Sequence, residues 1–371
     1  MRERAGIAFP AAVELESCRG DRDDSMSKRH LSVVLKVAIS AGLVYFVFRK
    51  VDWRECSDQM QAAFREGYGW LIAAVAVTGI ILAVGSWRWT MILRGHDVAI
   101  PYFHAFRLFL VGFFFSQFMP GGLAAGDVIR SYYTASCSPD KKMECVATVV
   151  LDRVVGSFGM LTVVVISLLL LGGKYLVVCL IVIGGTATIG VGAILFFSKG
   201  ILGKLPFAGW IYEHLPYREQ LSRAYEAFRH YREHKGELIV CWALSVLIHL
   251  LLVSVAYCVG NSVGVRATAP QYLVRVPLVG AITALPITFG NIGTAEFGYD
   301  TFFLAGHHPE AYHAVVAAFI LMMRLLWLFV GAMGGLIWWA EKGAISGRLV
   351  QQEDDVSERG ASGGGALDDS S

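Results

Sequence analysis

The chain has 371 residues, of which 55% are hydrophobic and only 17% are charged, and its mean hydropathy is +0.54. Soluble globular chains carry about 25% charged residues, so this composition excludes an ordinary water-soluble enzyme. The net charge of +2 provides no strongly basic surface for a nucleic-acid partner.

The charged residues are concentrated at the two ends of the chain, which divides it into three parts. Residues 1–30 form a polar N-terminal tail that is either disordered or a misassigned start, because Met26 precedes a basic stretch and an apolar segment. Residues 31–342 form one membrane domain, and residues 343–371 are expected to be a disordered polar C-terminal tail.

A helix that crosses a bilayer needs about 20 mostly apolar residues. Taken in chain order, the segments that meet this condition are 31–48, 70–93, 146–171, 175–197, 237–260 and 311–340. The predicted fold is therefore all-α, a polytopic bundle with about six spanning helices.

Two further apolar regions, 103–134 and 271–306, are interrupted by helix-breaking residues. The residues at these breaks are Pro120, Gly121, Gly122 and Gly126 in the first region, and Pro286, Gly290 and Gly293 in the second. Broken backbone at membrane depth is tolerated only where protein or a wet cavity surrounds it. We therefore predict two re-entrant helical hairpins.

The basic residues of the connections predict the orientation. With an inside N-terminus, and with each hairpin returning to the side it came from, 19 Lys and Arg residues lie inside and six outside. This places both termini in the cytoplasm. Apolar residues at helical spacing in the 198–236 loop predict an amphipathic helix on the cytoplasmic surface.

The same layout contains an internal repeat of two triplets, each a helix, a hairpin and a helix. After its break, each triplet has an acid, Asp127 or Glu296, and then an arginine 26 or 28 residues further on, Arg153 or Arg324. The charge count gives the triplets opposite topology, and inverted repeats with broken helices are a transporter architecture.

Six charged residues fall inside otherwise apolar segments: Asp127, Arg130, Asp152, Arg153, Glu296 and Arg324. Left unpaired, they would cost on the order of 15 to 20 kcal/mol on the insertion scale, more than a fold's usual stability of about 5 to 15 kcal/mol. One interpretation is a neutral ion network that fixes the helix registry. The other is a site in which the three arginines and the glycine-flanked helix N-termini hold an anionic head group, while the acids meet an amine, hydroxyls or a proton.

Two other polar residues have two interpretations each. Gln117, at the first hairpin tip, either donates to a ligand or satisfies the opened backbone. Arg88, near the cytoplasmic end of its helix, is either a gate or an anchor that extends to the membrane surface. The scattered cysteines and histidines predict no metal site and no cofactor, and no P-loop is present.

Four motifs in this order resemble the lysylphosphatidylglycerol synthase transmembrane region, a flippase-like family. They are Arg88-Trp89 with Ile92-Leu93, Pro120 through Gly126-Asp127-x-x-Arg130, Asp152-Arg153-Val154, and Pro286-x-x-x-Gly290-x-x-Gly293-x-x-Glu296. The resemblance covers residues 30–342 and departs from the pattern at Ala125, where Gly is common, and at Asp152, where Glu is common. It implies a multi-pass protein of the cell inner (cytoplasmic) membrane that moves or handles lipids. The soluble aminoacyl-transferring domain is not expected.

The favoured function is therefore translocation of a lipid with an anionic or zwitterionic head group, such as a phospholipid, a polyprenyl-linked lipid or a hopanoid-type lipid. The expected partners are that lipid and the bilayer, together with a lipid-biosynthetic enzyme or a second copy of the chain. The alternatives are an integral membrane enzyme that acts on a lipid-linked substrate and a non-transporting scaffold.

Overall fold

The computed structural model describes residues 19–119, 122–170, 184, 235–283, 288, 291–304 and 312–363. Several predicted features lie outside the described residues: the break residues Pro120, Gly121, Pro286 and Gly290, the span 175–197 apart from Gly184, the amphipathic helix of the 198–236 loop up to residue 234, and the end segments 1–18 and 364–371.

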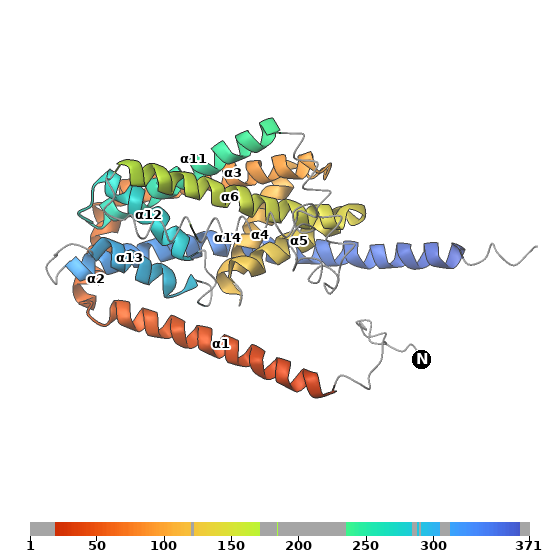
Figure 1. The fold of residues 1–371 in the computed structure, drawn as a ribbon, viewed down its shortest axis with the longest axis horizontal. Coiled ribbons are helices and arrows are strands. Elements are labelled where there is room, and N and C mark those ends of the chain that lie inside the picture. Colours follow the sequence, from red (N-terminus) through yellow and green to blue (C-terminus); the bar gives the residue numbers. More distant parts are fainter. Residues whose placement is uncertain are drawn as a thin grey trace, which may run out of the picture.

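Four helices are both long and apolar (Figure 1): α3 (Tyr68–Gly95), α6 (Lys142–Leu170), α11 (Lys235–Ser262) and α14 (Tyr312–Gly363). At 1.5 Å per residue, a helix of 28 residues is about 42 Å long, which exceeds the roughly 30 Å of a hydrocarbon core. By length and composition these helices can cross a membrane over Tyr68–Gly95, Pro139–Ser167, Gly236–Ser262 and Tyr312–Glu341. Four of the six predicted spans are thereby supported.

The predicted span 31–48 is helical, as part of α1 (Arg19–Phe48), but its apolar part Val34–Phe48 is shorter than the four spans. A short helix, α2 (Trp53–Arg65), follows it. The side chain of Asp52 caps α2 by accepting hydrogen bonds from the backbone N–H groups of Arg54 and Glu55.

Each region predicted to be a hairpin is a pair of short helices that pack on each other. The first pair is α4 (Tyr102–Phe118) with α5 (Leu123–Cys137), which the turn η1 (Pro139–Lys141) joins to α6. The second is α12 (Ala269–Thr283) with α13 (Thr294–Leu304). None of these helices exceeds 17 residues, or about 26 Å, so none is long enough to cross a bilayer alone.

Two of the predicted break glycines hold positions that a larger residue would not fit. A Cβ on Gly126 would collide with the carbonyl oxygen of Gly112, so α4 and α5 approach backbone to backbone there. Gly293 has a φ of +91°, and a Cβ on it would lie 2.9 Å from the carbonyl oxygen of Ser40 in α1. Gly122, which precedes α5, also has a positive φ, of 54°.

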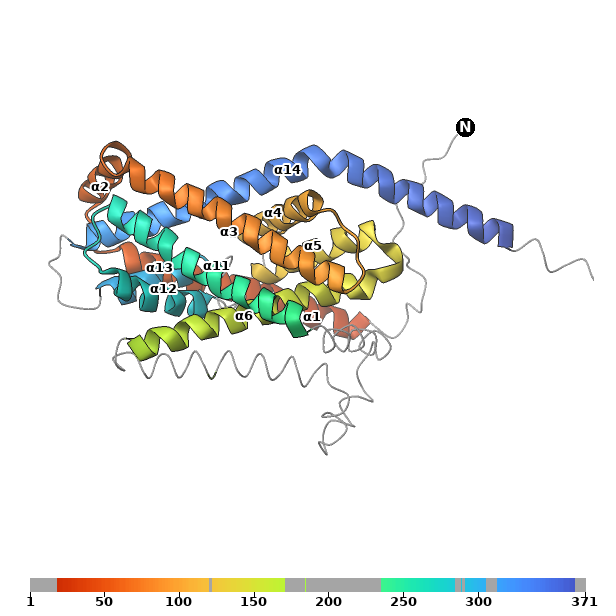
Figure 2. The ribbon, with the colours of Figure 1, turned by 90° about the horizontal axis from the view of Figure 1, so that it is seen from above.

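The helices of the second triplet run opposite to those of the first (Figures 1 and 2). Gly67, just before α3, approaches Ser262 at the end of α11, so these neighbouring helices are antiparallel. The end of α6 packs beside α12, where the Ser167 hydroxyl donates to the carbonyl of Leu273. By contrast, α14 begins near the α11–α12 connection and passes α4 before Trp338 donates to the Tyr133 hydroxyl of α5.

The terminal helices extend into the segments predicted to be polar tails. α14 continues as a helix to Gly363, within the predicted tail 343–371, and projects beyond the bundle in Figure 1. α1 likewise begins at Arg19, within the predicted polar tail. Residues 348–356 contain neither Gly nor Pro and include several good helix formers, which favours a helix over that part of the continuation.

Candidate functional site

Three buried charged residues form a triad in which one acid, Asp152, binds two arginines, Arg88 and Arg130. The Asp152 side chain on α6 is 2% exposed, and its carboxylate accepts from Arg88 Nε at 3.0 Å and from Arg130 Nη2 at 2.8 Å. Arg88 Nη1 also donates to the Ser245 hydroxyl of α11 at 2.6 Å. The triad joins α3, α5, α6 and α11, and it carries one more positive charge than negative.

Aromatic rings enclose one of these arginines. The guanidinium carbon of Arg130 lies 4.0 Å from the ring centroid of Trp89 and 5.2 Å from that of Phe109, distances at which a cation is attracted to a ring face. Arg88 is also buried, so it does not extend to the surface as a membrane anchor would. Its partner Asp152 lies 64 residues away in the chain, beyond the reach of local sequence patterns.

A second ion pair joins α5 to α6 at a more open position. Arg153 donates to Asp127 through Nε at 2.8 Å and through Nη2 at 2.7 Å, the parallel two-bond geometry typical of arginine and carboxylate. The side chains are 44% and 22% exposed, respectively. Although Asp152 and Arg153 are adjacent, they face different partners.

The third ion pair occupies the equivalent place in the second triplet. Arg324 of α14 donates through Nε and Nη2 to one carboxylate oxygen of Glu296 on α13, and Nη2 lies 3.3 Å from the carbonyl oxygen of Asn291. The other carboxylate oxygen of Glu296 accepts from the backbone N–H of Gly293 at 2.7 Å. The sequence separations of 26 and 28 residues thus correspond to two actual acid–arginine pairs, each directly after a helix break.

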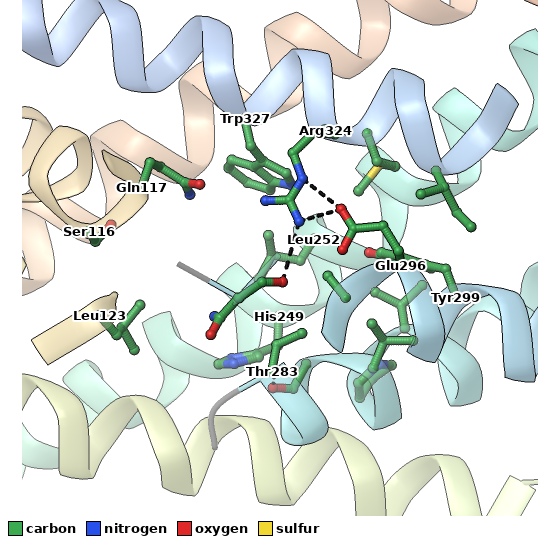
Figure 3. A pocket seen from close by; sticks show the side chains of 18 of the residues that line it. Ser116, Gln117, Leu123, His249, Leu252, Thr283, Glu296, Tyr299, Arg324 and Trp327 are labelled. Atoms are coloured by element: carbon green, nitrogen blue, oxygen red, sulfur yellow. Dashed lines mark hydrogen bonds and ion pairs between the residues drawn. The ribbon is translucent and has the colours of Figure 1, made fainter. Parts of the chain in front are cut away.

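This third pair lines a cavity of about 360 Å³. Its walls come from α4, α5 and α6 of the first triplet and from α11, α12, α13 and α14 of the second, so the cavity lies between the triplets. Figure 3 shows Arg324 and Glu296 on one side, and His249 with Thr283 across from them. Much of the remaining wall is apolar, as at Leu252 and Trp327.

The predicted site residues are therefore distributed over three places. Gln117, Glu296 and Arg324 meet in the cavity wall. The other predicted charges, Asp127 with Arg153 and Asp152 with Arg88 and Arg130, pair with one another and are not among the cavity-lining residues. Among the described residues, no group of three His, Cys, Asp or Glu side chains is arranged to hold a metal ion.

The sequence reasoning missed His249, a polar residue of the cavity wall. The signal was available, because His249 is an ionisable residue inside the apolar segment 237–260 and such residues mark functional sites in membrane helices. A count of Asp, Glu, Lys and Arg in the apolar segments does not include it.

Comparison with known proteins relates the chain to a family of membrane proteins. The family model for the lysylphosphatidylglycerol synthase TM region matches residues 33–335. A UPF0104 membrane protein of Methanocaldococcus jannaschii is 24% identical over 281 residues, which are 69% of this chain and 80% of the relative. A UPF0104 membrane protein of Methanothermobacter thermautotrophicus is also 24% identical, over 290 residues that cover 71% of this chain and 83% of the relative. The chain therefore belongs to the family of the lysylphosphatidylglycerol synthase transmembrane region and is a multi-pass integral membrane protein.

Proposed function

We propose that this protein is a lipid carrier that moves a lipid with an anionic or zwitterionic head group between the two leaflets. The observation that carries the proposal is the cavity between two oppositely running triplets, with Arg324 in its wall. Nη1 of Arg324 has no hydrogen-bond partner among the described residues, so its two N–H groups are available to a ligand. A guanidinium with free donors matches the oxygens of a phosphate.

The dimensions of the cavity favour a head group over a whole lipid. A volume of about 360 Å³ lies near the lower end of the roughly 300 to 1,000 Å³ typical of ligand pockets. A phosphate with a small polar substituent fits such a space, whereas two acyl chains would remain in the bilayer. The mostly apolar wall beside the polar corner suits the junction between a head group and its chains.

The same arrangement suggests how transport proceeds. In this proposal the α4–α5 and α12–α13 pairs are two oppositely oriented re-entrant hairpins, and the triplets form an inverted repeat. Carriers of this type expose a central site to each side in turn by rocking one repeat against the other. Both termini would then be cytoplasmic, and the chain would act in an inner membrane as a carrier rather than an enzyme.

The experiment is a leaflet-exchange assay in proteoliposomes with fluorescent phosphatidylglycerol and phosphatidylethanolamine, whose outer-leaflet fraction is quenched by dithionite. We expect the full-length protein to accelerate exchange of at least one of the two lipids, and Arg324→Gln to slow it at least tenfold. Arg107→Gln is the matched control, because Arg107 forms an exposed ion pair with Glu341 outside the cavity.

Equal exchange rates for the wild type and Arg324→Gln, with both proteins folded by circular dichroism, would overturn the proposed site. No acceleration by the wild type with either lipid would favour an enzyme or a scaffold. Turnover of the lipid would then indicate the enzyme, and co-purification of a lipid-biosynthetic protein would indicate the scaffold.

A further inference from the structure

His249 faces the cavity with a defined hydrogen-bonding role (Figure 3). Its Nδ1 lies 2.8 Å from the carbonyl oxygen of Ser245. A carbonyl only accepts, so Nδ1 carries the hydrogen, and Nε2 of the neutral ring is left as an acceptor. The hydroxyl of Ser245 accepts a hydrogen bond from Arg88, so His249 is linked through Ser245 to the buried triad.

Other polar atoms of the cavity wall are acceptors as well. The Thr283 hydroxyl donates its hydrogen to the carbonyl of Gly280 at 2.8 Å, and the Ser116 hydroxyl donates to the carbonyl of Phe113 at 2.7 Å. Each hydroxyl has thereby used its one hydrogen, and only its lone pairs remain for a ligand. The cavity wall thus places the cationic donor Arg324 opposite neutral acceptors at His249, Thr283 and Ser116, while Gln117, Tyr299 and Trp327 add further polar groups.

We propose that His249 is a specificity-determining residue, which accepts a hydrogen bond from the part of the head group beyond the phosphate. The ligand chemistry that complements this wall is a phosphodiester whose substituent carries hydroxyl or ammonium hydrogens. A substituent without such hydrogens would leave the acceptors without partners, and unpaired polar groups are what make a site reject an analogue. The inference rests on the proposed function, since it places the phosphate at Arg324.

The test compares lipids of equal charge and equal chains whose head groups either carry such hydrogens or lack them. Dihexanoylphosphatidylglycerol and dihexanoylphosphatidylmethanol have the same charge and chains, but only the first has free hydroxyls. Dihexanoylphosphatidylethanolamine and dihexanoylphosphatidylcholine form the matching pair for an ammonium donor. Binding of each is measured by titration calorimetry on the full chain in a maltoside detergent.

We expect the wild type to prefer the donor lipid of at least one pair by about tenfold, equivalent to about 1.4 kcal/mol. His249→Leu should abolish the preference, whereas His249→Gln should retain part of it because an amide oxygen accepts a hydrogen bond. Ser254→Ala is the matched control on the same helix, since the Ser254 hydroxyl is exposed and bonds to the carbonyl of Leu250.

The possible results distinguish failure of this inference from failure of the proposed function. Arg324→Gln should weaken both members of a pair equally, and binding unaffected by that change would overturn the phosphate site itself. If Arg324→Gln weakens binding but the wild type shows no preference in either pair, the role of His249 is refuted while the carrier function stands. A preference that survives His249→Leu would also refute that role.

Discussion

Removing the charge of Asp152 should destabilise the protein more than any other single change to its ion pairs. Asp152→Asn keeps the shape of the side chain but leaves Arg88 and Arg130 buried, 7% and 4% exposed, without their carboxylate. Breaking a buried ion pair by removing one partner costs about 3 to 5 kcal/mol. This is a large fraction of a typical stability of about 5 to 15 kcal/mol.

Two comparison variants test whether this loss of stability arises from the buried, central position of Asp152. Asp127→Asn breaks a pair in which Arg153 is 44% exposed, and pairs open to solvent contribute about 1 kcal/mol or less. Arg88→Met leaves Asp152 paired with Arg130, so its effect should be smaller than that of Asp152→Asn.

The assay is unfolding in mixed micelles of dodecyl maltoside and increasing sodium dodecyl sulfate, followed by tryptophan fluorescence. The reasoning is refuted if Asp152→Asn lowers the free energy of unfolding no more than Asp127→Asn does. It is also refuted if Arg88→Met has the larger effect, because the carboxylate would then not be the centre of the triad.

Two further changes probe the packing. Gly126→Ala should destabilise the protein by about 1 to 3 kcal/mol in the same unfolding assay, because the new Cβ meets the carbonyl of Gly112, whereas Gly79→Ala, with nothing within 4 Å, should not. Brominated lipids should quench Trp87, which is 50% exposed, but not the fully buried Trp89. Trp87→Phe should therefore remove more of the quenching than Trp89→Phe, and the reverse order would mean that α3 turns its other face to the lipid.

Much of the bundle could be predicted from the sequence because a membrane-spanning helix corresponds to a continuous run of apolar residues. The helix breaks could also be predicted, since a glycine such as Gly293 adopts a backbone conformation that other residues avoid. The sequence also showed an acid followed by an arginine at matching positions in the two triplets, but it left open whether these charges pair or hold a ligand. The structure pairs Asp127 with Arg153 and Glu296 with Arg324.

The three-dimensional partners of the remaining polar residues could not be predicted in this way. In the sequence, Arg88 resembles a surface residue because it lies near a helix end. In the fold it joins the triad through its contacts with Asp152 of α6 and Ser245 of α11. With Arg88 included, these ion pairs contain four arginines and three acids. The neutral ion network considered from the sequence alone therefore lacked one positive charge. The wall position of His249 likewise depends on how the two triplets meet, which no single segment encodes.

The neighbouring residues Asp152 and Arg153 limit how α6 can move. Successive side chains on an α-helix point about 100° apart, and here each binds a different ion partner: Asp152 holds Arg88 and Arg130, while Arg153 holds Asp127. A rotation of α6 about its axis, or a slide along it, would break both attachments at once. These contacts attach α6 to both α3 and α5, so in the proposed carrier mechanism the three helices would move together as one unit.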